Sequence, residues 1–266
     1  MPVLTKHHAL GNDFLVLFDD QPLPRLPFGT LAVRWCDRRR GLGADGLIVA
    51  VTNPPEGHDL GMVLHNADGS RAEMSGNGIR CLVQAYALRH ELGEGKVRVH
   101  TDAGTRPITF RPGSSPSEIE AEVGMGPASP IGEPERWASL GVDPLRPVAH
   151  LSLGNPHAVV AVDDVLALDL ELLGATVPSV NLEVVEAGPE PHAITMRVHE
   201  RGAGITEACG TGACASAHAA AAWGLATPVH GEILVHMDGG DARVALGPEL
   251  VLIGPSVFIA SAEVAL

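Results

Sequence analysis

Two short motifs each place a small nucleophilic side chain directly before a glycine: Ser75 in AEMSGNG (72–78) and Cys209 in TEACGTG (206–212). Both precede Ala- and Leu-containing stretches, Gly76–Arg89 and Gly210–Trp223, whose composition predicts long helices. A helix N-terminus carries partial positive charge and unpaired N–H groups, so it can favour a thiolate and bind a carboxylate. The two motifs therefore predict two acid–base positions, each beside an anion-binding helix start.

The two motifs belong to an internal repeat. AEMSGNG aligns with TEACGTG at an offset of 134 residues, and the same offset places His65 on His199. The tripeptide LGN occurs at 10–12 and again at 153–155, an offset of 143 residues, and an apolar segment follows each copy. Because two separate motifs recur in the same order, the chain is predicted to consist of two related halves.

Two such halves suit one reaction in particular. One acid–base group removes the α-proton of a bound amino acid, and the other delivers a proton to the opposite face, while the helix ends stabilise the charge that develops on the carboxylate. This inversion needs no cofactor. Lys6 and Lys96 are the only lysines and neither lies near a site-like motif, so pyridoxal phosphate, which needs a lysine, is not expected.

Composition excludes several classes of protein. The 266 residues are 45% hydrophobic, which is enough chain for one large domain or two ordinary ones and excludes a wholly disordered protein. A net charge of −14 disfavours sequence-independent nucleic-acid binding. The sequence shows no signal peptide and no apolar run of about 18 residues, so we expect a cytoplasmic protein that does not enter the membrane. The histidines lack ligand spacing, and no metal site is predicted.

Segments rich in Val, Ile and Leu alternate with turn residues and predict strands at 14–18, 47–51, 97–100, 108–110, 119–123, 158–162, 194–198, 233–237, 242–246 and 250–253. Shorter helices are expected at 28–37, 134–140 and 165–173. The Pro/Gly/Ser-rich stretch RPGSSPS (111–117) is either a domain boundary or a hairpin loop.

A set of motifs, in order along most of the chain, resembles that of the diaminopimelate epimerase family: HALGNDF (8–14), GADGL (43–47), NADGSRAEMSGNGIRC (66–81), GNPHAV (154–159), VNLEVVE (180–186) and ERGAGITEACGTGACA (200–215). A lone GNG or CGTG would be weak, but the set is specific. The resemblance implies a pyridoxal-independent two-base epimerase that interconverts LL- and meso-diaminopimelate, an intermediate between aspartate and lysine or peptidoglycan. It also implies a homodimer.

The resemblance implies an α/β (α+β) fold of two pseudo-symmetric domains, each a mixed sheet or barrel wrapped around a central helix. We expect an N-terminal half at 1–117, to which a C-terminal strand at 256–266 returns, and a second half at 118–255. The implied catalytic residues are Cys209 and Ser75, assisted by His157 and Glu200. The implied substrate-binding residues are Asn12, Asn66, Gly76, Asn77, Asn155, Asn181, Glu200, Arg201, Gly210 and Thr211.

Ser75 departs from the family pattern, which has a second catalytic cysteine at this position. A hydroxyl is a far weaker acid than a thiol, so its alkoxide is scarcely available near neutral pH. Three interpretations stay open: an engineered Cys→Ser substitution, a natural active variant, or a natural member that has lost or changed its activity. The corresponding alternatives for function are a racemase or epimerase of another amino acid and a catalytically silent diaminopimelate-binding homologue.

Overall fold

The protein, described here by a computed structural model, is defined at residues 1–23 and 25–264. Its contacts divide it into unit 1, formed by Met1–Val123 and the chain from Gly254 onward, and unit 2, Gly124–Ile253. The chain passes from unit 1 to unit 2 within strand β8 (Glu118–Gly126) and returns within β17 (Leu250–Glu263). RPGSSPS closes the antiparallel hairpin of β7 (Gly104–Pro112) and β8, so it is a loop inside unit 1. Of the expected C-terminal strand at 256–266, positions 265 and 266 lie outside the described residues.

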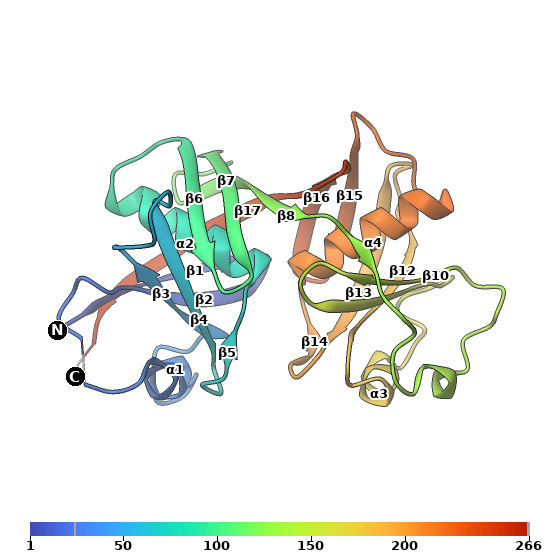
Figure 1. Ribbon diagram of the computed structural model, residues 1–266, viewed down its shortest axis with the longest axis horizontal. Coiled ribbons are helices and arrows are strands. Elements are labelled where there is room, and N and C mark those ends of the chain that lie inside the picture. The colour runs from blue at the N-terminus through green and yellow to red at the C-terminus, as the bar shows by residue number, and fades with distance from the viewer. Residues whose placement is uncertain (24, 265–266) are drawn as a thin grey trace. The chain divides into compact units, whose positions relative to one another are not determined.

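Unit 1 is a closed ladder of eight strands around one helix (Figure 1). The ladder runs β1–β2–β3–β4–β6–β7–β8–β17 and closes on β1. The pairs β2–β3 and β4–β6 are parallel, and β1–β17, β1–β2, β3–β4, β6–β7 and β7–β8 are antiparallel. Helix α1 packs against β3 and β4. The bounds are β1 Val3–Ala9, β2 Asn12–Phe18, α1 Phe28–Cys36, β3 Gly46–Val51, β4 Leu60–Asn66, β5 Arg71–Ala72, α2 Gly76–Arg89, β6 Gly95–Thr101 and β7 Gly104–Pro112.

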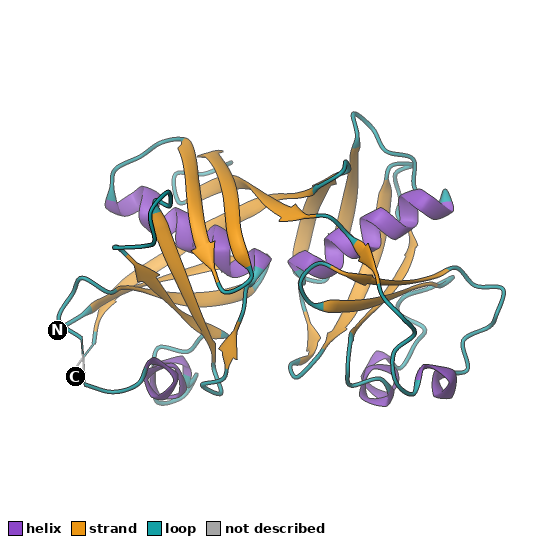
Figure 2. Cartoon of the chain, viewed as in Figure 1, coloured by secondary structure: helices purple, strands orange, loops and turns teal. Residues whose placement is uncertain are grey.

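Unit 2 repeats this arrangement. Its ladder runs from β9 through β10, β11, β12, β13, β15 and β16 to β17, with parallel pairs at β11–β12 and β13–β15, and helix α4 contacts strands of this ladder. The bounds are β9 Ser129–Pro130, η1 Trp137–Leu140, β10 Val148–Ser152, β11 Pro156–Ala161, α3 Leu170–Thr176, β12 Asn181–Ala187, β13 Ala193–Glu200, β14 Gly204–Thr206, α4 Gly210–Trp223, β15 Glu232–Met237 and β16 Gly240–Ala245. The predicted mixed α/β fold is confirmed (Figure 2).

Burial explains why the two long helices occupy the centres of their units. Nearly every residue of α2 from Gly76 to Ala87 is buried, and α4 is buried from Gly210 through Ala217. A helix that is apolar or small on all sides is stable only when it is surrounded. The alanines and glycines of α4 let strands approach its backbone closely, so that this helix fits inside a ladder of strands.

The expected strands are all present, but seven others were not predicted: β1, β4, β5, β9, β10, β12 and β14. Three of these, β5, β9 and β14, have only two or three residues. In β1, β4, β10 and β12, histidine or charged residues interrupt the apolar pattern. The helix expected at 165–173 begins later, at Leu170, because the Asp169 side chain caps it by accepting a hydrogen bond from the Leu172 N–H. At 134–140 only the single 3₁₀ turn η1 forms.

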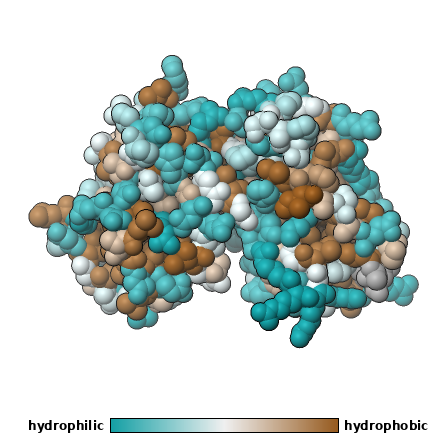
Figure 3. Space-filling model, turned by 180° about the vertical axis from the view of Figure 1, so that it is seen from behind, coloured by the Kyte–Doolittle hydropathy of each residue, from teal (hydrophilic) through white to brown (hydrophobic). Residues whose placement is uncertain are grey.

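The surface of each unit seen in Figure 3 mixes hydrophobic and hydrophilic residues. Within the described residues, no helix combines the length and apolar character needed to cross a membrane. The same residues contain no group of three or more His, Cys, Asp or Glu side chains arranged to hold a metal ion.

Candidate active site

Ser75 and Cys209 are the N-cap residues of α2 and α4 and have nearly the same backbone conformation. Ser75 has φ −137° and ψ 126°, and Cys209 has φ −125° and ψ 113°. Each side chain accepts a hydrogen bond from the N–H three residues on: the Gly78 N–H lies 3.0 Å from Ser75 Oγ, and the Gly212 N–H lies 3.4 Å from Cys209 Sγ. Both side chains therefore stand where the helix presents its positive end and its unpaired amides.

The strand registers fix which other positions correspond in the two units. Phe14 lies beside Gly46 in the parallel pair β2–β3, and His157 lies beside Asn181 in the parallel pair β11–β12. Leu47 is opposite His65 in β3–β4, and Leu182 is opposite His199 in β12–β13. When the two units are matched by these registers, each of the following residues of unit 1 corresponds to one of unit 2: Asn12 to Asn155, Phe14 to His157, Ile48 to Glu183, Asn66 to Glu200, and Ser75 to Cys209.

Cys209 is buried, with 4% of its surface exposed. Burial, together with the nearby carboxylates of Glu200 and Glu183, raises the pKa of its thiol well above the ordinary value, while Thr211 and the Gly212 N–H act in the opposite direction. The thiolate therefore needs help from its surroundings. Its donors are the Gly212 N–H and the hydroxyl of Thr211, which lies 3.5 Å from Sγ.

His157 and Glu183 form a fully buried pair next to this thiol. Their Nδ1 and Oε1 atoms lie 2.6 Å apart, and both side chains are 0% exposed. His157 Nε2 lies 3.0 Å from Asn155 Oδ1, and Asn155 Nδ2 donates to Thr211 Oγ1 at 3.2 Å. Glu183 was not predicted from the sequence, although a signal was present: it is a carboxylate between the apolar residues Leu182 and Val184 of β12.

The remaining residues expected in unit 2 lie at the ends of β12 and β13. Glu200 Oε1 accepts a hydrogen bond from Thr206 Oγ1 at 2.5 Å. The buried Asn181 accepts the Arg201 N–H at 2.8 Å, while Arg201 itself is exposed. Neighbouring strands thus place the Asn181 amide against the backbone of Arg201. An amide and a guanidinium are groups that suit an amino acid's carboxylate and amino groups.

Near the start of α2 in unit 1, the hydrogen bonds involve amide side chains, and the residues described there include no counterpart of the buried histidine–glutamate pair of unit 2. Asn77 Nδ2 donates to Asn12 Oδ1 at 3.3 Å, and Asn12 Nδ2 donates to Asp45 Oδ2 at 2.7 Å. Asn66 is exposed and donates to Ser70 Oγ at 3.0 Å. Near Ser75, a Cβ added at Gly78 would meet Ile48 Cδ1 at 3.3 Å, so the side chain that takes the place of Glu183 in this unit is apolar.

Asn12 is held by a charged cluster that the sequence analysis also missed. Asp13 accepts two hydrogen bonds from Arg38 and pairs with Lys6 at 2.9 Å, and Arg38 also binds Asp45 at 2.7 Å. Burial alone would raise the pKa of Asp13, but hydrogen bonds and charges from Arg38 and Lys6 outweigh it and lower that pKa below its ordinary value.

This cluster predicts a pH dependence of stability. Because the folded-state pKa of Asp13 is lowered, its contribution to stability is present above its unfolded pKa and is lost as the pH falls through the folded value. Arg38→Gln is expected to move the acid unfolding of unit 1 to higher pH, as followed by circular dichroism. Arg39→Gln, on the same turn, is the control and should leave the acid midpoint unchanged; equal midpoints for the two variants would contradict the assignment.

The two helix starts differ in how tightly their third residue is packed. A Cβ at Gly212 would lie 2.7 Å from Glu183 Oε1 and 3.2 Å from Cys209 Sγ, whereas one at Gly78 would meet nothing closer than 3.2 Å. Alanine normally favours a helix over glycine, but this clash involves a buried carboxylate that cannot move aside. Gly212→Ala is therefore expected to cost about 1–3 kcal/mol of unfolding free energy in urea titrations, and Gly78→Ala less. The reverse order would contradict this packing.

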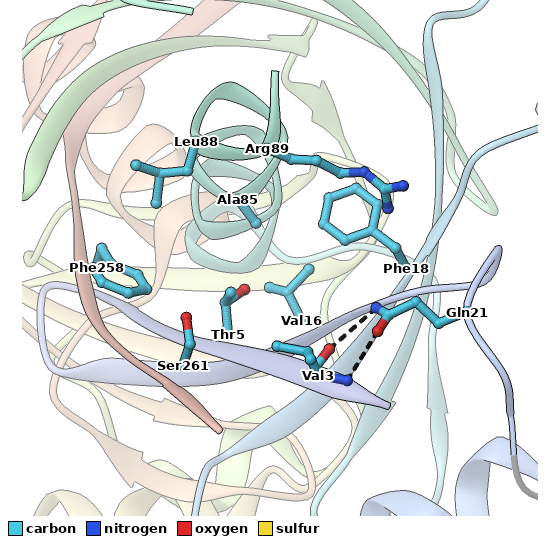
Figure 4. A pocket seen from close by; sticks show the side chains of 10 residues that line it. All are labelled: Val3, Thr5, Val16, Phe18, Gln21, Ala85, Leu88, Arg89, Phe258 and Ser261. Carbon is cyan, nitrogen blue, oxygen red and sulfur yellow. Dashed lines mark hydrogen bonds between the residues drawn. The ribbon is translucent and has the colours of Figure 1, made fainter. Parts of the chain in front are cut away.

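One hollow of unit 1 lies between β1, β2, α2 and β17, and Val16, Phe18, Arg89 and Phe258 are among the side chains that line it (Figure 4). None of the expected site residues lines it. The candidate active site is therefore defined by the helix starts and their hydrogen-bond partners rather than by this hollow.

Comparisons with known proteins agree with these motifs. The chain matches the family described as diaminopimelate epimerase over residues 4–131 and 150–259. It is 33% identical over 276 residues to the diaminopimelate epimerase of Desulfitobacterium hafniense, covering 96% of this chain and 95% of that one. It is 37% identical over 232 residues to the enzyme of the same name from Picosynechococcus, covering 80% of each.

Solved structures of similar fold include a phenazine biosynthesis protein of the PhzF family from Bacillus anthracis, with a TM-score of 0.75 at 15% identity, covering 100% of this chain and 99% of that one. A hydroxyproline epimerase from Agrobacterium vitis has a TM-score of 0.71 at 16% identity, covering 99% and 90%. These two likenesses concern the fold alone. The sequence matches go further, and the chain belongs to the diaminopimelate epimerase family.

Proposed function

We propose that this protein is an isomerase that interconverts LL- and meso-diaminopimelate without pyridoxal phosphate. The observation that carries the proposal is the matched cap geometry of Ser75 and Cys209 at equivalent places in two related units of a chain from this family. Each cap residue stands beside helix-start amides able to bind a carboxylate. One acid–base group from each unit is what inversion at an α-carbon requires.

In the proposed reaction, the substrate carboxylate binds the helix-start amides at Gly76 and Asn77 and at Gly210 and Thr211. The Cys209 thiolate takes the α-proton, the electron pair of the C–H bond is delocalised into the carboxylate, and the Ser75 hydroxyl gives a proton to the opposite face, forming the new C–H bond. The return reaction uses the same groups with exchanged roles. Ser75 is the weaker partner, since its alkoxide is poorly populated near neutral pH.

His157 and Glu200 assist the two acid–base groups in this proposal. Asn66, Asn155, Asn181 and Arg201 recognise the substrate's distal amino-acid end, and Asn12 is a further substrate-binding position. Amides and a guanidinium are suited to that end because it carries both a carboxylate and an ammonium group. A substrate with a single amino-acid end would leave these polar groups without ligand partners, which favours diaminopimelate over simpler amino acids.

The same proposal includes a cytoplasmic homodimer that takes a small amino-acid substrate and uses no cofactor. A net charge of −14 supports the expectation that nucleic acid is not a partner. Size-exclusion chromatography with light scattering tests the dimer directly, and a single mass near 27.7 kDa would contradict it.

The test of function is a turnover assay with each stereoisomer, run beside calorimetry with the same two ligands. The proposal expects both binding and interconversion of LL- and meso-diaminopimelate. Binding without turnover would identify a silent homologue. Turnover of another amino acid, with none of diaminopimelate, would identify a different racemase or epimerase.

A further inference from the structure

A chain of hydrogen bonds in unit 2 begins at Glu183 and ends on the sulfur of Cys209. Glu183 Oε1 lies 2.6 Å from His157 Nδ1, and His157 Nε2 lies 3.0 Å from Asn155 Oδ1. Asn155 Nδ2 lies 3.2 Å from Thr211 Oγ1, which lies 3.5 Å from Cys209 Sγ. Every link joins side chains of one unit, so the chain is complete within unit 2.

The partners of each atom show which group donates and which accepts in each of these hydrogen bonds. Asn155 uses its NH₂ group to donate to Thr211, so its carbonyl oxygen faces His157 Nε2, and that nitrogen must carry a proton to complete the bond. Because Thr211 Oγ1 already accepts from Asn155, its own proton is available to Cys209 Sγ. The sulfur thus receives two donors, Thr211 and the Gly212 N–H, and donated hydrogen bonds favour a thiolate.

The carboxylate at the start of this chain is itself close to the thiol. A Cβ built on Gly212 would lie 2.7 Å from Glu183 Oε1 and 3.2 Å from Cys209 Sγ, which places both atoms against the same backbone position. Burial raises the pKa of Glu183, and a negative charge here would oppose the thiolate. Its pairing with His157 compensates that charge locally while holding the imidazole ring in place.

Unit 1 lacks this chain although it repeats the fold. Phe14 and Ile48 stand at the positions of His157 and Glu183, and both are apolar. Asn12 stands at the position of Asn155. It accepts a hydrogen bond from Asn77 and donates one to Asp45. The pair is therefore not required to build this type of unit, and it accompanies the unit that carries the thiol.

We propose that Glu183 is a positioning residue whose buried carboxylate holds the His157 ring so that Nε2 is a proton donor. Nε2 then donates to the Asn155 carbonyl oxygen, the Asn155 NH₂ group donates to Thr211, and the Thr211 hydroxyl donates to the Cys209 sulfur. The expected effect of Glu183 on kcat rests on the proposed function. The protonation of His157 Nε2 can be tested without turnover.

Three variants test the catalytic consequence. Glu183→Leu removes the partner of Nδ1 and is expected to lower kcat about 100-fold, with KM nearly unchanged because Glu183 contacts no substrate. Glu183→Gln can donate its amide N–H to Nδ1 and so keep the proton on Nε2, and its loss is expected to be about tenfold or less. Glu186→Gln, an equal charge change on the same strand, should keep wild-type kcat. A Gln variant as impaired as the Leu variant, or a Leu variant with wild-type kcat, overturns the proposal.

Nitrogen NMR of ¹⁵N-histidine-labelled protein tests the arrangement independently of activity, with the His157 signals assigned by their loss in His157→Gln. We expect Nε2 to be protonated at pH 7 in the wild type and in Glu183→Gln, and its state to change in Glu183→Leu. An unprotonated Nε2 in the wild type, or identical signals in all variants, overturns the inference. If the wild type turns over neither stereoisomer, the proposed function fails while this readout still decides the role of Glu183.

Discussion

Ser75→Cys is expected to raise kcat for the interconversion of LL- and meso-diaminopimelate by about 100-fold, and Cys209→Ser to lower it by about 10³-fold. The gain is expected because a thiol exchanges protons near neutral pH far more readily than a hydroxyl does. The backbone at position 75 needs no change, since Cys209 occupies the same cap conformation in unit 2. Steady-state kinetics with each stereoisomer measures both effects.

Cys214→Ala is the matched control for loss of a thiol. Cys214 is buried in α4, five residues after the N-cap residue Cys209, so its removal should leave kcat near the wild-type value. The exchanged variant Ser75→Cys/Cys209→Ser should stay slow, because the His157–Glu183 pair accompanies only position 209. An unchanged kcat in Ser75→Cys would mean that position 75 does not limit proton transfer.

The second large effect is expected in stability. His157→Phe leaves the Glu183 carboxylate buried without its partner, and this should cost about 3–5 kcal/mol of unfolding free energy. Glu183→Ile leaves His157 Nδ1 without a partner and should cost about 1–3 kcal/mol. The double variant copies the apolar Phe14–Ile48 pair of unit 1 and should unfold at or above the wild-type urea concentration, because an apolar pair avoids the desolvation of buried charge.

The double variant should at the same time lose its epimerase activity, since the chain to Cys209 is gone. This combination of restored stability and lost turnover is specific to a pair kept for catalysis. The contradicting result is a double variant less stable than either single variant, which would mean that the polar pair is needed to build unit 2.

The two helix-cap positions, Ser75 and Cys209, could be predicted from sequence because they depend on local features. A glycine-flanked Ser or Cys before an Ala- and Leu-containing stretch is sufficient to place a helix start, and both predicted helices have the observed bounds. The internal repeat further predicted that Ser75 and Cys209 are equivalent positions in two related halves of the chain. The apolar strands were equally accessible, because β-branched residues are concentrated in them.

Glu183 could not be found in the same way. Its partner His157 lies 26 residues away, and only the parallel register of β11 and β12 brings them together. A carboxylate in a strand ordinarily indicates a solvent-exposed face, yet both faces of β12 are buried. The cluster of Asp13, Arg38 and Asp45 was missed for a related reason: its members come from three separate segments of unit 1, and their contacts follow from tertiary packing.

In the proposed mechanism, Cys209 and Ser75 act on opposite faces of one α-carbon, and solvent isotope incorporation distinguishes this mechanism from proton transfer by a single group. Each stereoisomer of diaminopimelate is incubated with the enzyme in D₂O, and deuterium at the inverting carbon is followed by NMR and mass spectrometry before equilibrium. We expect deuterium to enter from both the LL and the meso isomer, and Cys209→Ala to abolish entry from both. Deuterium entering from one isomer only, or entry that persists in Cys209→Ala, would contradict this mechanism.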